Sequence, residues 1–306
     1  MVKPITGHAF EFPPIRCLHD ARARRIVDVL RPGPALTDRG TAFTAMDYCL
    51  AHHVLEGAEA AARAADKESF SWYRAHSDAN AYAHTIPTEV GPRVIVSPDV
   101  DQMPRSGISE TPYYVLGAAT SAARAELRDL SAKAFAIGAD AGFAELLSGH
   151  AVVVCLLRSR SLGDALHSWT ITRLPGTVFC DYTSHPAVLA RDLIHEAGHN
   201  WLNDALTATQ CVISESAEFF SPWKQAMRPA YGFIHACWAF PLTMLFTAQA
   251  LDGTSGELRR FLCTYLDAQR RMLASTGSDH EQAIGLIGDQ DLRRRLHAVY
   301  HRARAL

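Results

Sequence analysis

The chain has 306 residues, of which 48% are hydrophobic and 20% are charged, and its formal net charge is −2. This composition excludes a mainly disordered chain, which would need low hydrophobicity and high net charge, and a general polyanion binder, which would need a basic excess. No apolar run reaches the roughly 18 residues of a membrane span, no secretory signal is visible, and the seven scattered cysteines include no CxxC pair. We therefore expect a cytoplasmic protein with reduced thiols.

Residues 1–150 are expected to form a helical, alanine-rich region. Apolar residues at helical spacing predict three helices, over Leu36–Arg63, Glu68–Tyr82 and Tyr113–Gly138. The proline-containing segment Ile86–Pro112 holds one short apolar stretch, Val94–Val96, and is interpreted as a long connection. It is expected to be either a surface linker or a lid over a site.

The pattern changes in residues 151–306. Three short strands of one small sheet are predicted, over Ala151–Leu157, His167–Leu174 and Thr177–Tyr182. From Pro186 the chain is predicted to be helical to its end, and Pro241 should kink the helix that contains it. The last two helices are expected over Glu257–Leu273 and Glu281–Ala305. The arginines of the last helix are interpreted as a solvated face, so no nucleic-acid partner is expected.

A His-Glu-x-x-His motif lies in the predicted helix that follows the third strand. His195 and His199 are four residues apart, so they differ by only about 40° around a helix axis and project together, as two ligands of one metal ion must. Glu196 follows His195 directly and lies next to this face of the helix, within reach of a metal-bound water or of a group that hydrogen-bonds to a metal ligand. The ordinary alternative is an amphipathic helix with two histidines, but the preceding strand and the apolar neighbours favour a metal site.

The fold class expected from these elements is α+β and mostly helical. One small mixed or antiparallel sheet should pack beside the HExxH helix, as in metalloprotease cores and unlike a cupin barrel. The helical region, residues 1–150, and the HExxH region, residues 151–306, are expected to pack around the metal cleft as one catalytic unit.

The motif leaves the third metal ligand open. Leu202 and Ala205 stand where a metzincin has Gly and His, so that subclass of zinc peptidases is excluded. Other zinc peptidases take a Glu from a later helix, and Glu215 or Glu218 would serve. These two acids are equally well explained as the first turn of a helix that begins near Ser214.

His235 is the other candidate for the third ligand. It lies in an apolar stretch that Pro229 is expected to begin as a helix. A lone histidine in such a helix is usually a hydrogen-bonded core residue, but this helix follows the HExxH helix after one connection. Arg228 should lie at the edge of an apolar pocket, where a guanidinium suits a carboxylate.

Two blocks of the sequence resemble the αKG-HExxH family, which comprises 2-oxoglutarate-dependent iron enzymes that modify ribosomally made peptides. The first block runs from Leu174 through the HExxH motif to Asn203, with Ala197-Gly198 in place of a commoner bulkier pair. The second block, Trp223 to His235, is similar to the family pattern W-R-x-x-x-R-P-x-x-G-x-x-H, with Lys224 replacing an Arg. The resemblance covers about residues 170–245.

The resemblance implies an iron(II) centre held by His195, His199 and His235. It also implies that 2-oxoglutarate chelates the iron and that Arg228 pairs with its distal carboxylate. The reaction would couple oxidative decarboxylation of 2-oxoglutarate to succinate with O2-dependent hydroxylation, usually at the β-carbon of a residue in a peptide. Glu196, the candidate catalytic acid, would then orient a group beside the metal.

Two other functions fit the residues. In a zinc metallopeptidase, Glu196 would be the general base that activates a zinc-bound water, and Arg228 would have no required role. A non-catalytic, zinc-stabilised binding module is less favoured, because structural zinc usually has cysteine ligands in a closed shell. For a peptide substrate, the strands Ala151–Leu157 and Thr177–Tyr182 are candidates to offer a sheet edge. The composition leaves the oligomeric state open.

Overall fold

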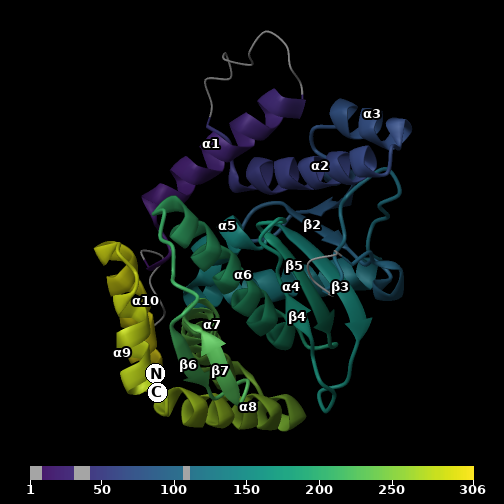
Figure 1. The fold of residues 1–306 in the computed structure, drawn as a ribbon. Helices are drawn as coiled ribbons and strands as arrows, with labels where there is room; N and C mark the ends of the chain where they lie inside the picture. Colours follow the sequence, from purple (N-terminus) through teal and green to yellow (C-terminus); the bar gives the residue numbers. More distant parts are fainter. Residues whose placement is uncertain (1–8, 31–41, 106–110) are drawn as a thin grey trace.

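The computed structural model of the chain describes residues 9–30, 42–105 and 111–306. At its centre, five strands form a sheet between two layers of helices (Figure 1). The strands are β1 (Thr85–Ile86), β2 (Arg93–Val96), β3 (Val153–Ser159), β4 (Ser168–Trp169) and β5 (Thr177–Tyr182). Their order is β1-β2-β3-β5-β4, with β2, β3 and β5 parallel and the two edge strands antiparallel to their neighbours. A small mixed sheet in a mostly helical protein confirms the α+β class.

Both faces of the sheet are buried. One face packs against α2 (Ala45–Arg63), and the other packs against a layer that includes α6 (Pro186–Ala208). Successive side chains of a strand point to opposite faces, so on β3 Val153 joins the core that contains α2 and Val154 joins the core that contains α6. This two-sided burial explains why β3 lies in a continuous apolar run rather than an alternating one. Because β1 and β2 precede residue 150, the sheet joins the two regions of the chain.

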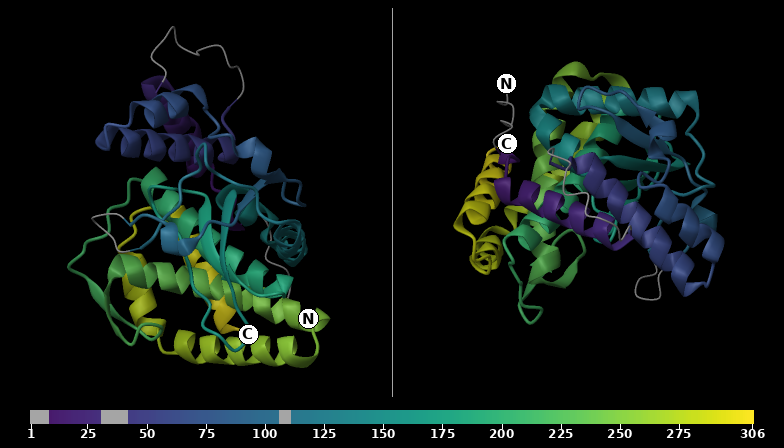
Figure 2. Two further views of the ribbon diagram at one scale, coloured as in Figure 1. Left: turned by 90° about the vertical axis from the view of Figure 1, so that its right-hand side faces the viewer. Right: turned by 90° about the horizontal axis from the view of Figure 1, so that it is seen from above.

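The remaining helices surround the sheet and α6. They are α1 (Pro13–Leu30), α3 (Lys67–Ala75), α4 (Ala125–Gly138), α5 (Ala144–His150), α7 (Ala230–Ala250), α8 (Gly256–Ala274), α9 (Gly277–Gly285) and α10 (Gln290–Arg304). Helices α1 to α3 lie at one end and α8 at the other, with α6 and α7 between them (Figures 1 and 2). The stretch 230–253, which includes α7, is long and apolar enough to cross a membrane, but 67% of its apolar 18-residue window is buried inside the protein, as is typical of a core helix.

The helix predictions are only partly confirmed. Helix α2 occupies the second half of Leu36–Arg63, of which residues 36–41 lie outside the described chain, and α3 ends at Ala75 rather than Tyr82. The helix predicted to begin at Tyr113 begins only at Ala125. Pro229 is the residue directly before α7, and Pro241 lies inside that helix.

The single helix predicted over Glu281–Ala305 is two helices, α9 and α10. The prediction that the chain is helical from Pro186 to its end is also wrong between α6 and α7. This connection contains a hairpin of β6 (Glu218–Ser221) and β7 (Ala226–Pro229). Gln225, in its turn, has a φ of 50°, the left-handed conformation that reverses the chain. The acids at positions 215 and 218 therefore lie in a turn and a strand, not in the first turn of a helix.

The interpretation of Ile86–Pro112 as a connection is wrong for Arg93–Val96, which forms the fully buried strand β2. Arg93 obscures this strand in the sequence, because a charged residue is rarely buried. Its Nη2 donates to the carbonyls of Val90 (2.6 Å) and Ser148 (2.9 Å), which pairs this end of the guanidinium in the core.

The three strands predicted after residue 150 are confirmed, although β4 is only two residues long. The expectation that Ala151–Leu157 or Thr177–Tyr182 offers a free edge is wrong, because β3 and β5 are each paired on both sides. Strand β4 is the edge strand on that side of the sheet, and it contacts α6.

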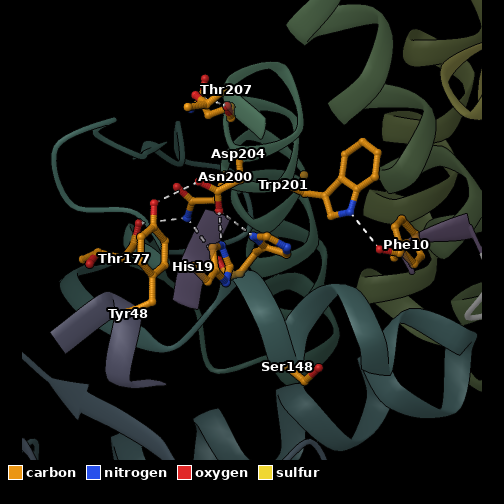
Figure 3. Close-up of polar contacts among 12 residues, drawn as sticks. Phe10, His19, Tyr48, Ser148, Thr177, Asn200, Trp201, Asp204 and Thr207 are labelled. Carbon is orange, nitrogen blue, oxygen red and sulfur yellow. Dashed lines mark hydrogen bonds and ion pairs between the residues drawn. The ribbon is translucent and has the colours of Figure 1, made fainter. Parts of the chain in front are cut away.

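Trp201 joins α6 to α7 and to the chain that leads into α1. It is fully buried, its ring stacks on Trp238 at 4.7 Å, and its indole N–H donates to the Phe10 carbonyl at 3.0 Å (Figure 3). We expect Trp201→Ala to lower the free energy of unfolding by about 3–5 kcal/mol, measured by urea denaturation. Trp72→Ala, at a half-buried tryptophan of α3, is the matched control and should cost less. Equal losses in the two variants would contradict this role.

His53 makes the protein sensitive to acid. The Leu116 N–H donates to its Nδ1 at 3.2 Å, so Nε2 carries the proton and donates to the Thr177 hydroxyl at 2.9 Å. Burial lowers the pKa of His53 to about 3. Below pH 6.5 the unfolded chain therefore binds a proton at this residue that the folded chain does not, and stability falls as the pH falls toward 3.

From pH 7 to pH 4.5, we expect His53 alone to remove about 2–3 kcal/mol of stability. The measurement is urea unfolding at the two pH values for the wild type and for His53→Gln, whose amide keeps one donor and one acceptor but does not titrate. The variant should lose less stability between these pH values, and an identical loss would refute the assignment.

Candidate metal centre

Helix α6 holds the HExxH motif inside the protein. Pro186 occupies its first turn, where the missing N–H costs nothing, and the helix packs against α4, α5, α7 and β5. His195 and His199 are one turn apart, and their Nε2 atoms are separated by 3.1 Å. This separation suits two ligands of one ion, because both lone pairs reach a common point. The two predicted histidine ligands are therefore brought together.

Glu196 completes a compact group with these histidines. Its carboxylate is nearly inaccessible, Oε1 lies 3.9 Å from His195 Nε2, and the ligand atoms of the three residues all lie within 4.8 Å of one another. The Ser168 hydroxyl on edge strand β4 donates to Oε1 at 2.6 Å. Burial is the main cause that raises the pKa of Glu196 to about 8; the hydrogen bond from Ser168 opposes the shift, and the charge of Asp192 adds to it.

His235 lies beside His199 from the first turns of α7. The two Nδ1 atoms are 3.0 Å apart, and His235 Nε2 is buried without a hydrogen-bond partner in the described chain. His199 thus presents Nε2 to His195 and Nδ1 to His235, which places these two residues at different edges of its ring. The structure brings the three histidines into one row, with His199 in the middle.

Burial is the main cause that lowers the pKa of all three histidines, and it lowers the pKa of His199 to about 4. The charges of Arg191 and Lys224 add to the shift at His195. Near neutral pH these imidazoles are therefore neutral, which is the protonation state that metal ligation needs.

Glu215 and Glu218, the alternative third ligands, are exposed in the connection between α6 and α7. Neither belongs to the group formed by His195, Glu196 and His199. Of the sequence-predicted candidates, His235 is the one that contacts the HExxH histidines.

The segment Trp223 to His235, which includes part of the β6–β7 hairpin, packs beside the HExxH histidines. Trp223 stacks on Phe240 with ring centroids 4.7 Å apart, and Phe240 in turn lies 4.8 Å from the His195 ring. Arg228 is exposed on β7, and its guanidinium covers Gly232, where an added Cβ would lie 3.1 Å from an Arg228 nitrogen. The spacing between Arg228 and Gly232 therefore has a steric basis.

Two sizeable pockets have volumes of about 510 and 650 Å³, and the larger one lies away from these elements, between α2, α3 and the segments 97–104 and 113–121. The smaller one is lined by α6 residues that include Asn203 and by Tyr231, whose ring lies 4.4 Å from the His235 ring. Neither pocket is lined by the three histidines or by Arg228. The expected pocket edge at Arg228 is therefore not found in these two cavities.

A buried polar cluster farther along α6 was not foreseen. Asp204 accepts hydrogen bonds from His19 (2.8 Å) and from the Tyr48 hydroxyl (3.2 Å), and His150 Nδ1 lies 3.4 Å away (Figure 3). Although burial alone would raise the pKa of Asp204, the contacts with His150 and His19 hold it well below its usual range. These residues come from α1, α2 and α5, so the Asp204 carboxylate links three helices to α6. No local pattern marks this cluster, because its members are far apart in the sequence.

A scan against models of known protein families and a search of curated proteins both find no match to this chain. The functional argument therefore depends on the residues of the site.

Proposed function

We propose that this protein is an Fe(II)- and 2-oxoglutarate-dependent oxygenase of the cytoplasm that hydroxylates a C–H bond, at the β-carbon of a residue in a ribosomally made peptide. The observation that carries the proposal is the way the second block folds onto the HExxH helix. His235 contacts His199, and the Trp223–Phe240 stack contacts His195. A peptidase requires neither the stack nor Arg228.

The residues fit an iron ion. Three neutral imidazoles are available, and the Nε2 atoms of His195 and His199 converge. His235 faces the other edge of the His199 ring, and its Nε2, which lacks a partner in the described chain, would reach the same ion by rotation of the side chain. Three protein ligands leave adjacent positions open for a bidentate cosubstrate and for O2. Iron bound here would supply the oxidising chemistry that couples loss of CO2 from 2-oxoglutarate to hydroxylation.

The protein's own residues have separate roles in this proposal. Arg228 binds the distal carboxylate of 2-oxoglutarate, because a guanidinium forms two parallel hydrogen bonds with a carboxylate. Glu196, fixed by Ser168, orients the groups beside His195. The rings of Trp223 and Phe240 exclude water from the side of His195 that they cover.

An extended peptide is the proposed substrate because the sheet has an edge beside the centre. Among the described residues, strand β4 pairs with β5 alone, and the Ser168 hydroxyl on β4 donates to the motif glutamate. A peptide that adds to β4 through main-chain hydrogen bonds would pass along the HExxH helix, the arrangement of a metalloprotease-like core.

One observation favours the alternative, a zinc metallopeptidase. Glu196 lies within the histidine group, where a general base for a zinc-bound water would have to lie. The deciding experiment is anaerobic reconstitution with Fe(II) followed by 2-oxoglutarate. The oxygenase should develop a visible metal-to-cosubstrate charge-transfer band and, with O2, release succinate. Absence of the band, with tight zinc binding and peptide hydrolysis, would establish the peptidase instead.

A further inference from the structure

We propose that Glu281, His297 and His301 form a second metal site, for a divalent transition-metal ion such as Zn²⁺, where α9 meets α10 (Figure 1). His297 and His301 are one turn apart on α10, and Glu281 reaches them from α9. All three side chains are 45–52% exposed, so an ion from solvent has access to them. The proposed oxygenase reaction makes no use of this site.

The three ligand atoms form a nearly equilateral triangle. His297 Nε2 and His301 Nε2 are 3.0 Å apart, and they lie 3.1 and 3.2 Å from Glu281 Oε1. The centre of such a triangle is about 1.8 Å from each atom, so an ion about 1 Å above its plane lies about 2.0–2.1 Å from all three, as zinc does from nitrogen and oxygen ligands. The triangle has the size that a first-row metal ion requires.

Hydrogen bonds alone do not account for this arrangement. If both Nε2 atoms carry protons and donate to Glu281, the 3.0 Å contact between them joins two donors. If one Nε2 is bare and accepts from the other, its lone pair faces the carboxylate oxygen. One of the three contacts is therefore unfavourable in each neutral arrangement, whereas a cation is attracted to all three atoms.

His280 gives an independent indication of a ligand on the buried side. It is 1% exposed, its Nδ1 has no hydrogen-bond partner in the described chain, and this atom lies 4.0 Å from Glu281 Oε1. Its ring is held by stacking on Tyr300 at 3.5 Å. A buried polar atom left unpaired is costly, and a metal ion, directly or through a bound water, would satisfy it.

The ligand types select the metal. Imidazole suits Zn²⁺, Ni²⁺ and Cu²⁺, while Mg²⁺ and Ca²⁺ prefer oxygen ligands. Arg294 and Arg295 of α10 pair with Asp291, so their charge is partly neutralised near the site. An ion here would cross-link α9 to α10, and α10 packs against α7, which carries His235.

The test is Zn²⁺ binding, by calorimetry and by metal content after dialysis, in a His195→Ala/His199→Ala background that removes the first centre. We expect one equivalent of zinc to remain and Mg²⁺ not to displace it. Adding His297→Ala and His301→Ala should weaken this zinc binding by more than roughly 10- to 100-fold, which is the loss expected for a residue that only hydrogen-bonds to a metal ligand. The control is His76→Ala, at an exposed histidine outside the cluster, which should bind as the background does.

No zinc in the background protein, or unchanged affinity after loss of His297 and His301, would overturn the proposal. If the background variant does not fold, the comparison is made in the intact chain, where the His297→Ala/His301→Ala protein should bind one equivalent less than the wild type. An equal number of equivalents in those two proteins would also overturn it. Zinc should in addition slow hydrogen exchange in α9 and α10 of the wild type but not of the double variant.

Discussion

Replacing His235 by alanine should reduce bound iron from one equivalent to near zero in the reconstituted protein. The reason is that two ligands one helical turn apart, His195 and His199, form a weak chelate. A third imidazole completes a set of three ligands, in the place of the carboxylate of the usual two-histidine, one-carboxylate triad. Iron content after desalting is the measurement, and the charge-transfer band with 2-oxoglutarate should disappear with the metal. His199→Ala should lose iron equally, because His199 contacts both other histidines.

His185→Ala is the matched control, since this residue precedes α6 and contacts none of the three histidines in the described chain. It should retain full iron. Full iron in His235→Ala would refute ligation by His235 and would return Glu215 and Glu218 to consideration. Both acids are exposed and outside the histidine group, so they would have to move to reach the metal. A thermal melt of each variant separates loss of metal from loss of fold.

The sequence was informative where local chemistry decides the structure. The i, i+4 spacing of His195 and His199 predicted their convergence, and the apolar run of β3 predicted a strand, because helix geometry and two-sided burial each leave a local pattern. The position of His235 in a helix followed from Pro229 and an apolar stretch.

The sequence was uninformative where distant segments meet. Strand β2 contains a buried arginine, Arg93, whose hydrogen-bond partners are carbonyl groups of a loop and of α5. The residues that flank Arg93 in the sequence do not indicate these partners. Ser168 is an ordinary strand residue until the fold brings it to Glu196, and Asp204 binds groups from three other helices. The hairpin was obscured because serine is favoured both at the start of helices and in turns.

Replacing Arg228 by alanine should leave the iron in place but impair the use of 2-oxoglutarate. In our proposal the guanidinium binds the distal carboxylate, and a hydrogen bond between charged groups is worth about 1.5–3 kcal/mol. We therefore expect kcat/KM for 2-oxoglutarate to fall about 10- to 100-fold, measured as succinate release, with unchanged iron content. Arg228→Lys, which keeps the charge but not the two-pronged geometry, should fall between the wild type and the alanine variant.

Lys224→Ala is the sharpest comparison, because this lysine is exposed on the same hairpin and its charge helps to lower the pKa of His195. If Arg228 binds the cosubstrate, Lys224→Ala should alter succinate release less than Arg228→Ala. The reverse order would move the carboxylate site to Lys224, the position where this chain departs from the motif it resembles. A Gly232→Val variant tests the same point without changing Arg228 itself. Because Gly232 has no Cβ, the Arg228 guanidinium can lie over the start of α7, and a valine side chain should displace it. Gly232→Val should therefore reproduce the Arg228→Ala defect only if Arg228 is the residue that binds 2-oxoglutarate.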